Sequence, residues 1–193
     1  MPTPMPTPAP TPSSVFTCDF DSSTCGVGSA DYAWTRNSGS TPTSYTGPSG
    51  DHTTGSGYYM YVDPGAASRE YTLETSLFEQ CVGEVRFWYH MYSSWSYMMG
   101  TLELQESTNS GVSWSTIWTK SRSQGDSWQL AEVFVTTMYV NQVRFVGTTY
   151  GSTVNANGYG GWYYYEQGDM AIDDLRVLGS LDCDQNPTPA PTP

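Results

Sequence analysis

The chain has 193 residues, enough for one sizeable domain, and its 19 acidic side chains against 7 Lys or Arg give a formal net charge of -12. This charge argues against nucleic-acid binding, because phosphate contacts require a cationic surface. No apolar run approaches the roughly 20 residues of a membrane-spanning helix, so we expect no membrane insertion by this segment.

Proline alternates with small residues over 2–12 and again over 187–193. Such stretches adopt extended polyproline II and act as stiff spacers. We therefore expect linkers at 1–14 and 186–193 around one β domain at 15–185. This organisation is typical of one module in a larger secreted or cell-surface protein, whose signal peptide we expect outside this segment.

Strand patterns fill the region between the linkers. Residues 81–92 form the anchor, and a period of two divides them into one apolar face (Val85, Phe87, Tyr89, Met91) and one mixed face (Arg86, Trp88, His90, Tyr92). Because Trp88 and Tyr92 carry much apolar area, we expect a central strand covered on both sides. Further strands are expected at 15–21, 57–63, 69–75, 101–106, 112–118, 128–135, 142–146 and 170–178. About ten short strands without helical periodicity predict an all-β fold, an antiparallel jelly-roll β-sandwich.

The cysteines are an even set, Cys18, Cys25, Cys81 and Cys183, with no C-x-x-C pair. This spacing argues against a zinc ribbon and predicts two disulfides. Disulfides persist outside the reducing cytosol, so we expect an extracellular or cell-surface location.

A series of motifs recurs in order along the chain: Phe16-x-Cys18-Asp19-Phe20-Asp21, Cys25-Gly26, Trp34, Gly47-Pro48-x-x-Asp51-His52-Thr53, Gly57-x-Tyr59-x-Tyr61-Val62, Cys81 followed by Phe87-Trp88-Tyr89-His90-Met91-Tyr92, Gly100-x-Leu102, Trp128, Phe145 and Ala171-Ile172-Asp173-Asp174-Leu175. Together they resemble a MAM domain, the extracellular module shared by meprins, neuropilins and receptor-type tyrosine phosphatases. The resemblance covers about residues 16–183. Two departures stand out: Asp21, where the family usually has Glu, and the segment 148–168, where the family has a brief connection.

The resemblance implies a jelly-roll sandwich whose disulfides pair Cys18 with Cys25 and Cys81 with Cys183. The second bridge would clamp the central strand to the end of the domain, and a closed loop of about 100 residues contributes roughly 4–5 kcal/mol in the loop-entropy model. The family also implies adhesive contacts, homophilic or heterophilic, outside the cell.

Several carboxylates are candidate calcium ligands. Asp173 and Asp174 lie in an apolar strand, where an unpaired charge costs several kcal/mol, while Asp21 ends a strand and Asp51 lies in a turn. Calcium takes six to eight oxygen ligands, so we expect a structural ion on Asp21, Asp51 and Asp173, with Asp19 and Asp174 as further candidates. The alternative is that these acids accept turn N–H groups or pair with arginines such as Arg36, in a surface that simply stays solvated.

Aromatic residues suggest a contact surface. Trp162, Tyr163, Tyr164 and Tyr165 lie beside glycines in the unusual 148–168 segment, and Trp95 and Tyr97 lie in a loop after the anchor strand. Tyr and Trp give large contact area at little entropic cost, so these rings are candidate partner or sugar contacts. Alternatively, 162–165 forms one more strand packed on the sandwich.

The histidines argue against an enzyme, because His52 and His90 have no nucleophile elbow or metal-ligand spacing beside them. Paired acids at the spacing of a jelly-roll glycanase are also absent from the sequence. We therefore expect a non-catalytic module that binds a protein, itself or another, at the cell surface. A calcium-dependent carbohydrate-binding module and an accessory domain of a secreted protease or glycosidase remain as alternatives.

Overall fold

The computed structural model describes residues 12–28, 33–64, 68–150, 152–156, 161–165 and 168–180. Its strands form two main antiparallel sheets and one separate hairpin. The larger sheet has the order β2 (Thr35–Asn37), β3 (Tyr59–Val62), β12 (Met170–Gly179), β5 (Val82–Met91) and β8 (Gln129–Phe134), with β1 (Ser14–Cys18) paired to the second half of β12. The smaller sheet has the order β4 (Glu70–Glu74), β9 (Gln142–Thr148), β6 (Thr101–Ser107) and β7 (Ser115–Ser121).

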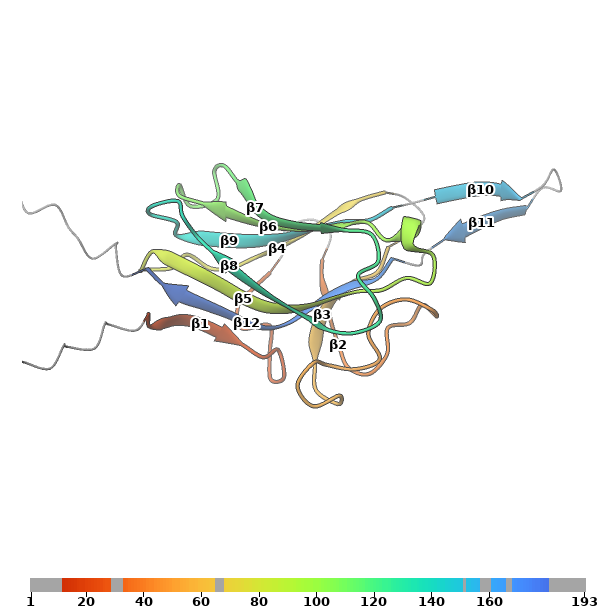
Figure 1. The fold of residues 1–193 in the computed structure, drawn as a ribbon, viewed down its shortest axis with the longest axis horizontal. Helices are drawn as coiled ribbons and strands as arrows, with labels where there is room; N and C mark the ends of the chain where they lie inside the picture. The colour runs from red at the N-terminus through yellow and green to blue at the C-terminus, as the bar shows by residue number, and fades with distance from the viewer. Residues whose placement is uncertain are drawn as a thin grey trace, which may run out of the picture.

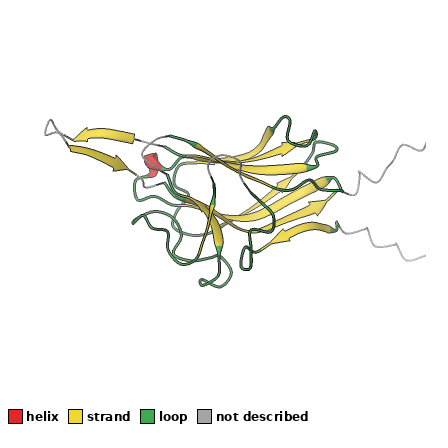
Figure 2. Cartoon of the chain, turned by 180° about the vertical axis from the view of Figure 1, so that it is seen from behind, coloured by secondary structure: helices red, strands yellow, loops and turns green. Residues whose placement is uncertain are grey.

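The two sheets stack face to face, and the views from front and back show the same sandwich (Figure 1, Figure 2). The hairpin of β10 (Ser152–Ala156) and β11 (Gly161–Tyr165) extends beyond one end of it. The described chain starts and stops at the opposite end, where the Gly179 N–H donates to the carbonyl of Ser13 (2.8 Å). The predicted all-β jelly-roll sandwich is therefore confirmed.

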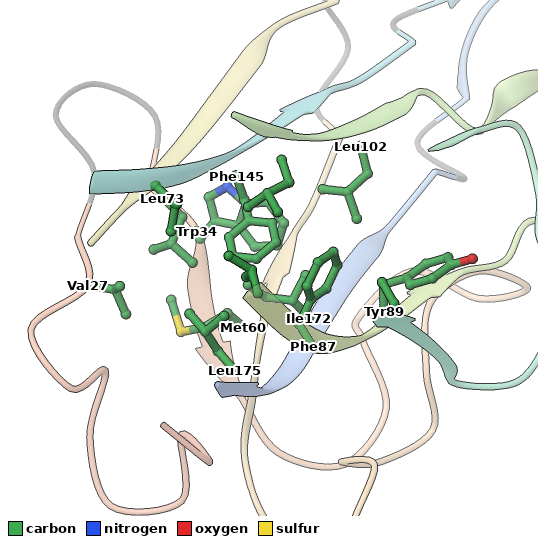
Figure 3. Packing of buried hydrophobic residues seen from close by; sticks show 14 of the residues in the cluster. Val27, Trp34, Met60, Leu73, Phe87, Tyr89, Leu102, Phe145, Ile172 and Leu175 are labelled. Atoms are coloured by element: carbon green, nitrogen blue, oxygen red, sulfur yellow. The ribbon is translucent and has the colours of Figure 1, made fainter. Parts of the chain in front are cut away.

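The anchor strand is central, as predicted, because β5 lies between β12 and β8. Its apolar face points into the sandwich, where the ring of Phe87 lies 4.8 Å from that of Phe145 (Figure 3). The ring of Trp118 lies 5.1 Å from that of Phe87. Leu102 from β6 and Ile172 from β12 complete this part of the core. Fully burying a side chain of this size stabilises the fold by roughly 1.5–3 kcal/mol. Burial of the apolar face of β5 therefore helps to hold the two sheets together.

Two strand boundaries were predicted wrongly by three residues. The strand expected at 15–21 ends at Cys18, because Phe20 adopts a left-handed conformation (φ 57°), so Asp21 lies beyond the strand and does not end it. Residues 112–118 were expected as a strand, yet β7 begins at Ser115 and Val112 is 83% exposed. The reason is a turn in which the Asn109 side chain accepts a hydrogen bond from the Ser113 N–H (2.9 Å), with Ser110 and Gly111 in left-handed conformations. This turn delays the strand by three residues relative to the apolar pattern.

The first predicted disulfide is confirmed, since Cys18 and Cys25 are bonded with their Cα atoms 5.9 Å apart. Cys81 is also disulfide-bonded. Its expected partner Cys183 lies outside the described residues, as do most of the two proline segments, so that pairing and the linker boundaries stay predictions.

The 148–168 segment contains the two strands β10 and β11, but neither of them joins a sheet of the sandwich. Strand β11 pairs with β10 alone, with Trp162 opposite Asn155 and Tyr164 opposite Thr153. The alternative of an additional strand packed on the sandwich is therefore wrong. The side chains of 162–165 lie outside the part that the structure describes.

Candidate functional site

A β-bulge in β12 separates two neighbouring carboxylates. Asp173 lies opposite Trp88 of β5, but the next regular pair is Arg176 with Arg86, so β12 holds one extra residue there. Asp174 adopts a left-handed conformation (φ 48°) at the bulge. As a result Asp173 is buried (1% exposed), whereas the side chain of Asp174 remains 27% exposed.

The buried Asp173 carboxylate accepts two backbone hydrogen bonds, from the His52 N–H (2.8 Å) and the Asp174 N–H (2.7 Å). Burial raises the pKa of Asp173 to about 7, and the negative charges of Asp174 and Asp51 add to this although the two hydrogen bonds oppose it. Burial thus favours the protonated form of this carboxyl in the pH range where exposed aspartates are ionised.

The loop from Asp51 to Gly57 is built on the Asp51 carboxylate. Asp51 accepts hydrogen bonds from the N–H groups of Thr54 (2.8 Å) and Gly57 (2.6 Å), and from the Thr54 hydroxyl. Burial alone would raise the pKa of Asp51, but these hydrogen bonds outweigh it and hold the pKa below its usual value. Asp51 is thus an ionised turn acceptor.

Asp21 reaches the other side of the same loop, where it accepts the Tyr58 N–H (2.8 Å). A Cβ added at Gly57 would lie 2.1 Å from Asp21 Oδ1 and 3.0 Å from Asp51 Oδ2, so two carboxylates flank this glycine. Asp19 is further out and accepts the Asp21 N–H (3.0 Å). Asp21, Asp51 and Asp173 therefore all accept hydrogen bonds from the backbone of the loop between Asp51 and Tyr58.

The contacts themselves are those of the alternative, because each of these carboxylates accepts turn N–H groups. The Arg36 guanidinium donates to the backbone carbonyls of Phe20 and Asp21 and not to the Asp21 carboxylate. Among the described residues, no three or more His, Cys, Asp or Glu side chains are spaced to hold a metal ion. In this arrangement the acids do not form a coordination shell, and calcium stays a prediction.

His52 connects this loop to the outer face of β5. Its ring stacks on Trp88 (centroids 3.7 Å apart, 15° between planes), and its Nδ1 lies 2.7 Å from Asp174 Oδ2. The Thr53 hydroxyl donates to the same oxygen (2.6 Å). These contacts give His52 a structural role, because the stacked imidazole fixes the orientation of the Trp88 indole.

His90, on the same strand, is buried beside Trp128 (ring centroids 5.5 Å apart). Burial lowers its pKa to about 4, against the opposing attraction of Asp126. His90 is therefore neutral at physiological pH, and together with Trp128 and the His52 loop it covers one end of the outer face of β5. The other end is open.

That open part holds a cavity of about 280 Å³, and seven residues from β1, β5, β8 and β12 line it: Thr17, Arg86, Trp88, Leu130, Glu132, Asp174 and Arg176. Sequence analysis missed this site. The period of two did put Arg86 and Trp88 on the mixed face of the anchor strand. Which residues of β8 and β12 lie beside them depends on the strand order and on the bulge, neither of which the pattern indicates.

The predicted aromatic surface is present in part. Trp95 and Tyr97 are 46% and 58% exposed and pack edge to face with centroids 5.9 Å apart. They lie at the short 3-10 helix η1 (Ser96–Met98), which both views place at the base of the β10–β11 hairpin (Figure 1, Figure 2).

Solved structures with a similar fold include the K1 cleaved adhesin domain of Lys-gingipain from Porphyromonas gingivalis (TM-score 0.51, 11% identity, 86% of this chain and 98% of that one). A family 29 carbohydrate-binding module is also similar (TM-score 0.47, 14% identity, 89% and 91% covered). At these identities the likeness extends to the fold alone.

Sequence relatives are more specific. MAM domain-containing protein 2 of Mus musculus is 31% identical over 170 residues, and Neuropilin-1a of Danio rerio is 32% identical over 192 residues. The matches cover 83% and 91% of this chain but only 22% and 19% of those proteins, so the chain spans about a fifth of their length. The family model for the MAM domain, meprin/A5/mu, matches residues 18–184. The chain therefore belongs to the MAM domain family.

Proposed function

We propose that this chain is a non-catalytic extracellular module that contacts a protein partner, either a second copy of itself or another protein, at the cell surface. Membership of the MAM family supports this, since the family is one of extracellular interaction modules. The described residues contain no helix long and apolar enough to cross a bilayer.

The observation that carries the proposal is the exposed pair Trp95 and Tyr97 at the hairpin end of the sandwich. Exposed large aromatic side chains that pack on each other form a preorganised contact patch. Because the described chain starts and stops at the opposite end, attachment there leaves the hairpin end facing outward (Figure 1).

A bead-aggregation assay tests this function, with the full chain coupled to beads at equal density. Wild-type beads should aggregate, and the Trp95→Ala/Tyr97→Ala variant should abolish or strongly slow aggregation. Phe134→Ala is a matched control, because Phe134 is also an exposed aromatic residue (72%) but is the last residue of β8 and not part of the Trp95–Tyr97 pair. Equal aggregation of the double variant and the wild type would remove Trp95 and Tyr97 from the contact.

We also propose a structural calcium ion at Asp21, Asp51 and Asp173. The support is the charge problem at Asp173, whose buried carboxyl faces the charges of Asp51 and Asp174. A divalent cation would compensate the charges of its ligands Asp21, Asp51 and Asp173, and Asp21 and Asp51 would exchange turn hydrogen bonds for it. Calcium should then raise the unfolding temperature of the wild type and leave Asp173→Asn unchanged, and a chelator should reverse the effect.

Carbohydrate binding is the second candidate function. The cavity on the outer face favours it, because an indole lies there beside guanidinium and carboxylate groups.

A further inference from the structure

We propose that the outer-face cavity of the larger sheet is a binding site for a neutral saccharide, with Trp88 as its aromatic platform. This inference rests on the second candidate function and assigns it to a place far from Trp95 and Tyr97. It is independent of the adhesive contact proposed for the hairpin end.

The platform is preorganised. His52 covers one part of the Trp88 indole at 3.7 Å and is itself held by Asp174, yet His52 is not among the residues that line the cavity. The cavity therefore contacts the indole where His52 does not. A fixed, half-buried indole beside an open cavity offers an apolar surface to the C–H face of a sugar ring without further ordering cost.

The polar groups around the indole suit hydroxyl groups. Arg86 and Arg176 supply N–H donors, Glu132 and Asp174 supply acceptors, and Thr17 supplies a hydroxyl that can do both. Arg86 is engaged with Glu84 (2.8 Å) and is 3.5 Å from Glu132. The Arg176 side chain is exposed and has neither an ion pair nor a hydrogen bond to any residue that the structure describes, so its donors are available.

The balance of charge selects a neutral ligand. Two cations and two anions line the cavity, so they nearly cancel. The chain as a whole has a net charge of -12, which repels an acidic polysaccharide. The volume, about 280 Å³, lies just below the usual range of ligand pockets, which suits one or two sugar units of a longer chain.

The bulge in β12 places the acid that completes this site. Without the extra residue, the regular alternation of β12 would continue past Asp173, and Asp174 would not adopt its left-handed conformation. With it, Asp174 both holds His52 and lines the cavity. Bulges that redirect a side chain are frequent at binding sites.

The test begins with an array of neutral and acidic oligosaccharides probed with the full chain. The strongest neutral ligand is then titrated calorimetrically into the wild type, Trp88→Ala, Arg176→Ala and the control Trp95→Ala. Circular dichroism checks the fold of each variant. Arg176→Ala changes an exposed side chain and keeps the test valid if Trp88→Ala is poorly folded.

We expect a neutral oligosaccharide to bind the wild type and Trp95→Ala equally. Trp88→Ala and Arg176→Ala should each lose at least about tenfold in affinity, which corresponds to 1.4 kcal/mol. Four results would overturn the proposal: no saccharide bound, acidic saccharides alone bound, unchanged affinity in folded Trp88→Ala or Arg176→Ala, or loss of affinity in Trp95→Ala. Aggregation of wild-type beads reports separately on the protein-contact function.

Discussion

The substitution Asp173→Asn should lower the stability of the fold at acidic pH and raise it at basic pH. In the wild type the pKa of Asp173 is raised from 3.8 to about 7, mainly by burial. Between these values the folded state binds more protons than the unfolded state, so the free energy of unfolding falls as pH rises. At up to about 1.4 kcal/mol per pH unit, the loss between pH 4 and pH 7 is about 3 kcal/mol.

The Asn side chain removes this penalty because it has no charge. It has only one acceptor oxygen, however, whereas Asp173 accepts both the His52 and Asp174 N–H groups. Leaving one buried donor without its acceptor costs about 1–3 kcal/mol at every pH. The variant should therefore be less stable than the wild type by about 1–3 kcal/mol near pH 4 and more stable by a similar amount near pH 8.

Urea denaturation in EDTA, followed by tryptophan fluorescence at several pH values, measures this difference directly. Other titrating groups act in both proteins and cancel in the comparison. Glu79→Gln is the control, since Glu79 is exposed and this substitution should not produce a crossing. Parallel stability curves for Asp173→Asn and the wild type would refute the argument that burial and neighbouring charges destabilise the Asp173 carboxylate.

Three further predictions concern the loop, the core and the disulfide. Gly57→Ala should destabilise the fold by about 1–3 kcal/mol in urea denaturation, because the new carbon would meet Asp21 Oδ1 at 2.1 Å, whereas Gly28→Ala meets nothing within 4 Å and should cost less. Phe87→Ala should cost about 3–5 kcal/mol by the same measurement, while Phe134→Ala, at a 72% exposed position, should stay within about 0.5 kcal/mol of the wild type. Cys18→Ser/Cys25→Ser should cost about 2–3 kcal/mol, because the bridge closes a loop with a sequence separation of 7. A free energy of unfolding equal to that of the wild type would show that the loop-entropy argument does not apply here.

Local patterns predicted much of this fold. The alternation of Val85, Phe87 and Tyr89 against Arg86 and Trp88 identified the central strand and both of its faces, because the period of a strand is visible in one segment. The turn conformation around Val112 could not be predicted from such a period. The apolar character of Val112 suggested a strand, but the Asn109 side chain stabilises a turn there.

The candidate sites depended on contacts that no single segment contains. Asp173 and Asp174 look alike in sequence, yet one extra residue in β12 buries the first and exposes the second. The stacking of His52 on Trp88 joins residues from a loop and a strand whose proximity follows from the position of β12 between β3 and β5. Such non-local pairing decides which side chains share a surface, and periodicity carries no information about it.

Self-association of the full chain can be measured by sedimentation velocity over a concentration series, once in calcium and once in EDTA. We expect a dimer whose fraction rises with concentration in calcium and falls in EDTA. Trp95→Ala/Tyr97→Ala should disrupt this dimer in both buffers. A monomer at every concentration in both buffers would contradict self-contact as the function of the hairpin end.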